Sequence, residues 1–156
     1  MMFGRFTVTY TYEQMIHFLS EEFAVFDMSL DVKLPRYNMA PGQQVLSIIK
    51  SGERYKVGTL KWGFLPTYST DRNYEYNLIN ARSEGLAEKS TFKDSLFHRR
   101  CLIVSDGFYE WDAKLKTQHP YYITFKDKRL RLYAGIWNKT TIGGITSYTC
   151  AIITTQ

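Results

Sequence analysis

The chain has 156 residues, the size of a single domain that can bury one hydrophobic core. Hydrophobic residues make up 44% and charged residues 22%, a balance that excludes a disordered chain, and no apolar run is long enough to span a bilayer as a helix. The net charge of +5 suits a polyanionic partner such as a nucleic acid.

The first 43 residues predict a strand, a helix and a connection. Residues 5–11 (RFTVTYT) are rich in β-branched and aromatic side chains, which is typical of a strand. Thr11 and Gln14 form a capping-box pattern that predicts a helix start. The helix has an apolar stripe at Tyr12, Met15, Ile16 and Leu19. Residues 27–43 are interpreted as a long polar connection.

The middle of the chain predicts a hairpin followed by less regular structure. Strand-like residues 44–50 and 54–64 flank Ser51-Gly52-Glu53, a natural turn. Residues 67–80 have the composition of a loop. Residues 83–96 are weakly helical, with Gly85 counting against a stable helix.

The last third predicts strand after strand, at 99–104, 108–111, 120–125, 130–137 and 147–154. We therefore expect one α+β domain, 1–156, built on a twisted antiparallel sheet or an irregular β-barrel with a few flanking helices. The segment 148–154 is apolar on both faces, as in a strand between two neighbours. If further chain normally follows it, an open edge and self-association are expected.

Basic residues are concentrated between positions 89 and 131, a segment that contains ten Lys and Arg residues and five acidic residues. Interleaved with aromatic rings, this segment would suit single-stranded nucleic acid, because cations neutralise phosphates and rings stack on bases. The alternative is a solvated basic face with no ligand.

Cysteine and histidine usage points away from metal and cofactor chemistry. Cys101 and Cys150 both lie in apolar strand-like segments and are interpreted as buried reduced thiols. The three histidines show no ligand spacing, so no metal and no cofactor are expected. The N-terminus does not have the pattern of a signal peptide, and a cytoplasmic location is expected.

Seven short blocks occur in an order that carries a family resemblance: 4–6 (GRF), 37–43 (YNMAPGQ), 61–66 (KWGFLP), 79–85 (INARSEG), 99–111 (RRCLIVSDGFYEW), 133–137 (YAGIW) and 149–155 (TCAIITT). Each block alone is weak. Together they resemble the SOS-response-associated peptidase family, also called the abasic-site processing family.

The resemblance implies an unusual chemistry on single-stranded DNA. Family members remove the initiator methionine and expose a cysteine, whose amine and thiol react with the aldehyde of an abasic site. An α-amine with a pKa of about 7.7–8.0 is partly neutral at cellular pH and can form a Schiff base. The thiol then closes a thiazolidine ring and leaves a stable DNA–protein crosslink; DNA lyase and self-directed peptidase activity accompany this chemistry in the family.

This sequence departs from the family pattern at both ends. By the Gly4-Arg5 register, Phe3 stands at the position of the family cysteine, whereas by distance from the initiator Met2 does. Neither side chain can close a thiazolidine. The family also carries a catalytic histidine in a later H-x-R-M-P motif, beyond Gln156. The expectation is a catalytically impaired copy, or a sequence that omits the true terminal residues.

Glu110, in FYEW, matches the family's catalytic glutamate, which is thought to move protons during Schiff-base chemistry. The alternative is that strand alternation points Glu110 to solvent, opposite Tyr109 and Trp111.

Several other positions match family residues that contact DNA. Asn80, in INAR, corresponds to an asparagine that hydrogen-bonds the crosslinked nucleotide; a turn-stabilising role is the alternative. Gly4 and Arg5 lie in the N-terminal motif, and Arg5 and Arg82 match arginines that contact phosphates, with surface salt bridges as the alternative. Trp62 and Trp111 lie in motifs that frame the DNA groove, with core packing as the alternative.

Three functions are compatible with these residues. The first is a family member that binds single-stranded DNA and senses abasic sites. The second is a non-catalytic single-stranded nucleic-acid-binding module. The third is a small-molecule enzyme that uses Glu110 and Asn80 in an aromatic pocket. For the first function we expect Glu110, Asn80, Arg5 and Arg82 to converge near the N-terminus.

Overall fold

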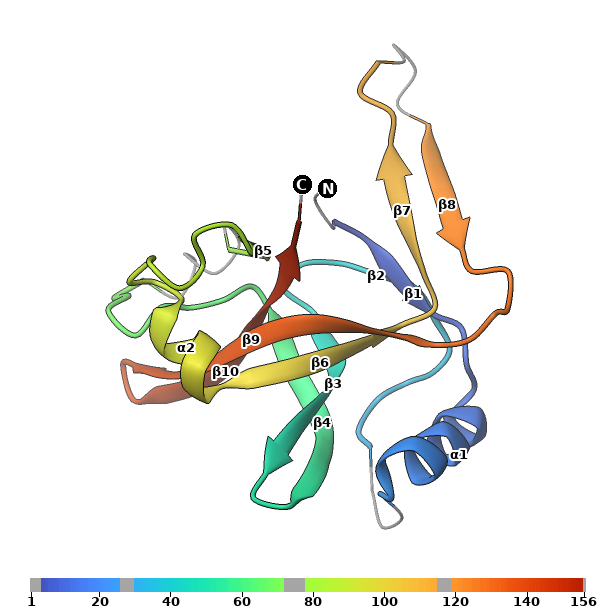
Figure 1. Ribbon diagram of the computed structural model, residues 1–156, viewed down its shortest axis with the longest axis horizontal. Coiled ribbons are helices and arrows are strands. Elements are labelled where there is room, and N and C mark those ends of the chain that lie inside the picture. Colours follow the sequence, from blue (N-terminus) through green and yellow to red (C-terminus); the bar gives the residue numbers. More distant parts are fainter. Residues whose placement is uncertain (1–3, 26–29, 72–77, 115–118, 156) are drawn as a thin grey trace.

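The computed structural model describes residues 4–25, 30–71, 78–114 and 119–155. A closed barrel of five strands forms the body of the protein (Figure 1). Its strands are β3 (Gln44–Ser51), β4 (Arg54–Trp62), β6 (Arg100–Ser105), β9 (Arg131–Ile142) and β10 (Ile145–Thr154). Strands in a ring of five cannot all run antiparallel to their neighbours, and here the parallel pair is β4 with β10. A short strand, β5 (Asn80–Arg82), adds parallel to the end of β10.

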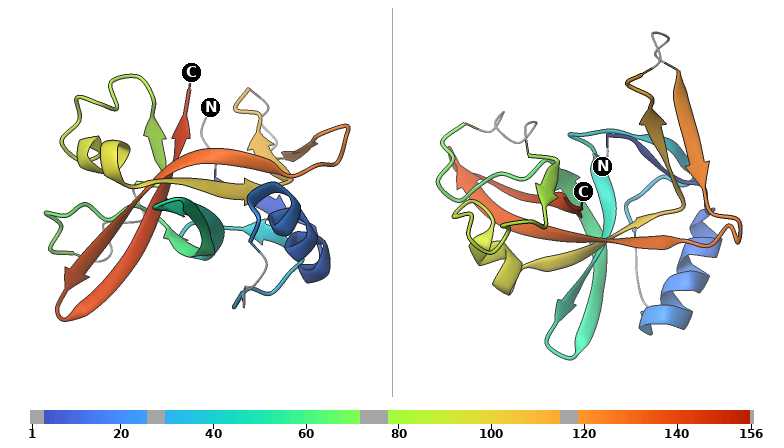
Figure 2. Two further views of the ribbon diagram at one scale, coloured as in Figure 1. Left: turned by 60° about the horizontal axis from the view of Figure 1, so that its bottom comes forward. Right: turned by 45° about the horizontal axis from the view of Figure 1, so that its top comes forward.

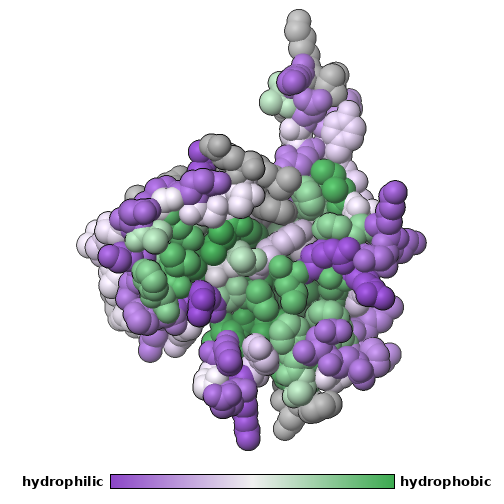
Figure 3. All heavy atoms as spheres, viewed as in Figure 1, coloured by the Kyte–Doolittle hydropathy of each residue, from purple (hydrophilic) through white to green (hydrophobic). Residues whose placement is uncertain are grey.

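A second, antiparallel sheet lies beside the barrel. Its strands, in order across the sheet, are β2 (Arg36–Met39), β1 (Phe6–Val8), β7 (Gly107–Trp111) and β8 (Pro120–Thr124). The chain passes from the barrel into this sheet at the corner between β6 and β7. The β7–β8 hairpin stands out from the body of the molecule in Figures 1 and 3. The expected α+β domain with an irregular barrel and flanking helices is confirmed.

The helix α1 (Tyr12–Phe23) begins as its sequence predicts. The hydroxyl of Thr11 accepts a hydrogen bond from the Gln14 N–H, and the Gln14 side chain accepts one from the Thr11 N–H. This reciprocal pair satisfies two of the free N–H groups at the helix start. Met15 and Leu19 are buried on the core-facing side of the helix.

The predicted β3–β4 hairpin and the five late strands are also confirmed, and Gly52 takes the positive φ that its turn requires. Two other predictions were wrong in part. The polar connection contains β2, whose four residues pair with β1 at a sheet edge and are too short to show alternation. The weak helix at 83–96 is mostly turns, and a helix, α2 (Lys93–His98), begins only at its end.

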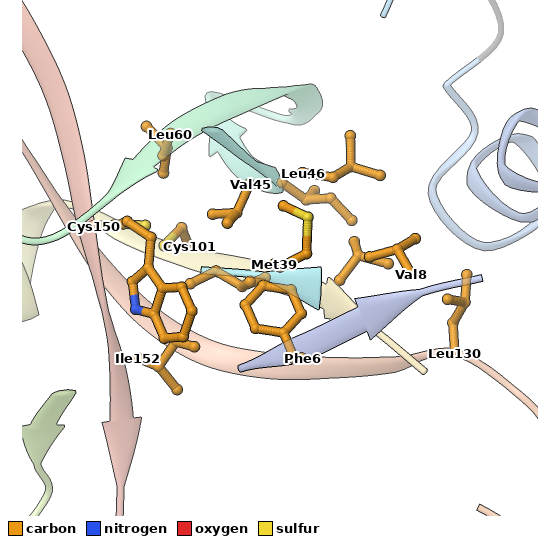
Figure 4. Close-up of a cluster of buried hydrophobic side chains, with 14 of the residues drawn as sticks. Phe6, Val8, Met39, Val45, Leu46, Leu60, Cys101, Leu130, Cys150 and Ile152 are labelled. Carbon is orange, nitrogen blue, oxygen red and sulfur yellow. The ribbon is translucent and has the colours of Figure 1, made fainter. Parts of the chain in front are cut away.

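The core lies inside the barrel and under β1, where side chains from both sheets meet (Figure 4). Cys150 and Ile152 of β10 point into this cluster, whereas Ala151 packs into a second cluster with Phe64 and Phe92. Burial of both faces explains the continuous apolar run of β10.

At its C-terminal end, β10 has strand neighbours on both sides as far as Ile152. Thr149 and Cys150 pair with β4 and residues 152–154 pair with β5, while β9 pairs with β10 from Ile145 to Ile152. Self-association of the chain stays a prediction.

Cys101 and Cys150 are buried and free, as predicted. Burial raises the pKa of the Cys101 thiol to about 12 and that of the Cys150 thiol well above its usual value.

The basic segment 89–131 does not form one patch. It begins beside α2 and ends at the β8–β9 turn, on opposite sides of the molecule (Figures 1 and 2). Two of its arginines are also paired, Arg99 with Asp94 and Arg131 with Asp127. Clustering in the sequence is thus not clustering in space.

In the described part of the chain, neither helix is long and apolar enough to cross a membrane.

Candidate functional site

The start of β1 lies against β7, and this places the N-terminal motif beside Glu110. Phe6 pairs with Phe108, and the Tyr109 N–H donates to the Arg5 carbonyl oxygen at 3.0 Å. Continuing this antiparallel register by one residue puts Gly4 opposite Glu110. Among the described residues, none lies within 4 Å of an ideal Cβ on Gly4, so on their side the backbone is open to approach.

Glu110 faces the core side of its sheet. It alternates with Tyr109 and Trp111, as predicted, but it shares its face with Phe108 and Phe6, both of which are buried. Glu110 itself is half-buried. Strand alternation therefore directs this carboxylate toward the edge of the core, and the alternative of a fully solvent-facing glutamate does not describe it.

Asn80 and Arg82 lie on the same face of β5, two residues apart. Asn80 pairs in register with Ile152 and Arg82 with Thr154, so both are held at the end of β10. The segment is fixed at either side, because the Ile152 N–H donates to the Ile79 carbonyl and the Ser83 N–H donates to the Thr154 carbonyl. Asn80 is half-buried and Arg82 is exposed.

Trp62 is fully buried and packs in the core. Its ring centroid lies 5.1 Å from that of Phe6, and its indole N–H donates to the Ile79 carbonyl at 3.0 Å. The core-packing alternative therefore describes Trp62, and its ring is not accessible for stacking on a base. Instead it connects the strand that follows Gly4 and Arg5 to the segment that begins at Asn80.

The two parts of the site lie on the same side of the molecule. The end of β10, which holds β5, lies beside the start of β1 in all the views of Figures 1 and 2. The β1–β7 pairing puts residues 4 and 5 beside Glu110 along the sheet, and the convergence of Glu110 with Asn80, Arg5 and Arg82 stays a prediction. Phe3, at the position of the family nucleophile, lies outside the described residues.

Trp111 and Arg5 lie on the other face of the β1–β7 pair from Glu110. Trp111 is 46% exposed and is available for stacking. Arg5 is opposite Tyr109 and donates from its guanidinium to the Gly4 carbonyl at 2.9 Å. These two side chains can contact a ligand at the rim of the site, on the side away from the carboxylate.

Sequence reasoning missed the polar contacts that hold the second sheet together. Asp106 is buried at the β6–β7 corner and binds Thr7 and Thr9, and the Tyr122 hydroxyl lies 2.9 Å from that of Thr7. Their signal is weak, because a single aspartate before a glycine resembles an ordinary turn residue.

A large open groove lies elsewhere, between α1 and the β8–β9 turn, with a volume of about 1290 Å³. Glu13 and His17 are on one wall and Arg129 is on the other. None of the residues predicted for the site lines it. Among the described residues, no three His, Cys, Asp or Glu side chains are grouped to hold a metal ion.

The chain is similar in sequence to one protein family and to several known proteins. The family model described as SOS response associated peptidase matches residues 2–156. The chain is 39% identical to the abasic site processing protein YoqW of Bacillus subtilis over 158 residues, covering 99% of this chain and 69% of that protein. It is 32% identical to the abasic site processing protein YedK of Escherichia coli over 123 residues, covering 78% of this chain and 53% of that protein.

A solved structure of a protein from Bordetella bronchiseptica has the same fold, with a TM-score of 0.74 at 21% identity, and the match covers 97% of this chain and 72% of that one.

Proposed function

The chain belongs to the SOS response associated peptidase family, and on that basis we propose that it binds single-stranded DNA and senses abasic sites. The observation that carries the proposal is the pairing of β1 with β7, which puts the N-terminal motif opposite Glu110. An amine at the N-terminus and a carboxylate that can move its proton are what Schiff-base chemistry on an aldehyde requires.

In the proposed reaction, the neutral α-amine attacks the ring-opened aldehyde of the abasic site. A carbinolamine forms and loses water to give an imine, with Glu110 delivering the proton to the departing hydroxyl. Phe3 brings no thiol to trap this imine as a thiazolidine. We therefore propose that the adduct of the printed chain is reversible and that the durable crosslink and the self-directed peptidase activity of the family are impaired.

The DNA contacts in this proposal come from both parts of the site. Arg82 is exposed beside Asn80 and is suited to bind a phosphate, while the Asn80 amide can both donate to and accept from the nucleotide. Trp111 provides an exposed ring for stacking at the rim. Trp62 acts indirectly, by holding the Ile79 carbonyl. We also propose the cytoplasmic location expected from the sequence.

The second candidate is a non-catalytic module that binds single-stranded nucleic acid, which Phe3 favours because it removes the trapping thiol. The two candidates differ in whether Glu110 is needed for an adduct. Protein is mixed with a single-stranded oligonucleotide that carries one abasic site, and the imine is reduced with borohydride. The amount of covalent protein–DNA adduct is then measured on a denaturing gel.

Glu110→Gln should lower the rate at which the trapped adduct forms by at least about tenfold, since general acid–base groups contribute about 10²–10⁴-fold to reaction rates. Affinity for the oligonucleotide should stay within about threefold. Glu53→Gln, in the exposed turn of the β3–β4 hairpin, is the matched control and should change neither quantity. Binding without any trapped adduct would favour the non-catalytic module, and absence of binding would reject both candidates.

A further inference from the structure

The strand β1 is too short to fix its own register. It pairs with β7 at two positions, and its pairing with β2 shifts register between Phe6 and Val8. In an antiparallel pair, a slip of one residue on one strand moves every side chain of that strand to the other face. A slip of β1 would replace Gly4 opposite Glu110 by another residue and would turn Phe6 out of the core.

Asp106 holds this strand from the corner between β6 and β7. Its Oδ1 accepts from the Thr7 hydroxyl at 2.7 Å, and its Oδ2 accepts from the Thr9 N–H at 2.7 Å and the Thr9 hydroxyl at 2.6 Å. Its own N–H donates to the Thr7 carbonyl at 3.1 Å. The carboxylate thus accepts hydrogen bonds from Thr7 in β1 and from Thr9, one residue beyond its end, and Asp106 is only 6% exposed. All three distances to the carboxylate lie in the range of well-formed hydrogen bonds.

The hydrogen bonds around Asp106 continue to β8. The Thr7 hydroxyl also contacts the Tyr122 hydroxyl of β8, and Tyr122 lies over Gly107, the residue after Asp106. Asp106 is four residues before Glu110 on the same stretch of chain. The hydrogen bonds from Asp106 to Thr7 and Thr9 therefore fix the position of β1 along the chain segment that leads to Glu110.

We propose that Asp106 is a positioning residue, a clamp that sets the β1–β7 register and so determines which N-terminal residue lies opposite Glu110. Asp106 touches neither DNA nor the reacting atoms in the proposed reaction. The proposal rests on the proposed function for its chemical consequence, since a displacement of about 1 Å at a reacting group is enough to cost about 10²-fold in rate.

The test compares Asp106→Asn with Asp127→Asn. Asp127 is a matched control, because it also accepts from a backbone N–H and a side chain but lies in the β8–β9 turn. Two readouts are taken from each variant. One is hydrogen exchange at the Tyr109 amide, which donates to Arg5, against that of the Ile136 and Cys150 amides of the barrel. The other is the rate of borohydride-trapped adduct at saturating abasic oligonucleotide.

Asp106→Asn should speed exchange at Tyr109 at least tenfold, leave the barrel amides within about twofold, and slow trapping about 10–100-fold without a change in affinity beyond about threefold. Asp127→Asn should change none of these. Unaltered Tyr109 exchange, equal loss of protection in the barrel, or normal trapping at saturation despite lost Tyr109 protection would each overturn the proposal.

If Asp106→Asn does not fold, Thr9→Val against Thr9→Ser makes the same comparison, because only the valine removes the 2.6 Å hydroxyl bond. Thr9→Val should shift both readouts in the same direction and Thr9→Ser should not; equal behaviour of the two would overturn the clamp. A wild-type chain that gives no trapped adduct would reject the proposed function, whereas Tyr109 exchange would still decide whether Asp106 sets the register.

Discussion

The indole N–H of Trp62 donates to the carbonyl oxygen of Ile79 at 3.0 Å, so a fully buried barrel residue holds the backbone directly before Asn80. The same ring packs on Phe6, which follows Gly4 and Arg5. The Trp62 side chain thus contacts two segments that are far apart in the sequence, one at Phe6 and one at Ile79. The geometry of the proposed site depends on a residue that a ligand cannot touch.

Trp62→Phe should therefore destabilise the protein. The change leaves a cavity and removes one of the two hydrogen bonds that the Ile79 carbonyl accepts, the other being from the Ile152 N–H. We expect a loss of about 1.5–3 kcal/mol in the free energy of unfolding, measured by urea denaturation. Trp111→Phe is the matched control, because Trp111 is 46% exposed, and it should change stability by no more than about 0.5 kcal/mol. Equal effects of the two substitutions would contradict the different placements of these rings.

Gly107→Ala should disturb the second sheet. An ideal Cβ at this position would lie 2.8 Å from the Tyr122 ring and 3.0 Å from the Thr7 hydroxyl oxygen. Because both neighbours are held by hydrogen bonds, we expect a destabilisation of about 1–3 kcal/mol in thermal or urea unfolding. Gly58→Ala, where a Cβ meets nothing within 4 Å, should be nearly neutral. A neutral Gly107→Ala would show that Tyr122 does not lie over this glycine.

Stability should fall at alkaline pH through the buried thiols. The pKa of Cys101 is raised from 9.0 to about 12 by burial, so the folded state keeps the proton that the unfolded state loses. The stabilisation is fully present below about pH 9 and is lost as the pH rises toward 12, by about 1.4 kcal/mol per pH unit for one thiol. Urea midpoints between pH 8 and 10.5 should therefore decline less steeply for Cys101→Ala than for the parent, and parallel declines would refute this assignment.

Binding of undamaged single-stranded DNA should weaken as salt rises, with Arg82 contributing to the slope. Replacing one phosphate contact lowers the slope of log affinity against log salt by about 0.7 for a single strand, which is the change expected for Arg82→Gln. Arg54→Gln serves as the control, since Arg54 lies at the tip of the β3–β4 hairpin and should leave the slope unchanged. An affinity that stays level from low to physiological salt would exclude this mode of binding.

The sequence predicts the elements of this fold better than it predicts which of them meet. The capping pair Thr11 and Gln14 and the two-sided apolar run of β10 are local signals, and both describe the structure. The strand β2 has no local signal, because its existence depends on pairing with β1. The basic residues of 89–131 look like one cluster in the sequence, yet the fold separates them.

The sequence likewise indicates candidate residues of the site but not the tertiary contacts that position them. Motif order led to Glu110, Asn80 and Arg82, and alternation correctly put Glu110 opposite Trp111. Alternation alone could not say which face of β7 is the buried one, because that depends on Phe6 in another strand. Trp62 and Asp106 carry their roles through tertiary contacts with Ile79 and Thr9, which no spacing in the sequence reveals.

We propose that the α-amine of this chain forms an imine with an abasic site and that Phe3, which carries no thiol, leaves this imine untrapped. Incubation with abasic single-stranded DNA followed by denaturation tests this directly. We predict a covalent adduct only when borohydride is present, and a reductant-independent adduct after Phe3→Cys with Met1 deleted, which leaves Met2 as the initiator before Cys-Gly-Arg. A stable adduct from the unmodified chain without reductant, or no adduct even with it, would contradict the account.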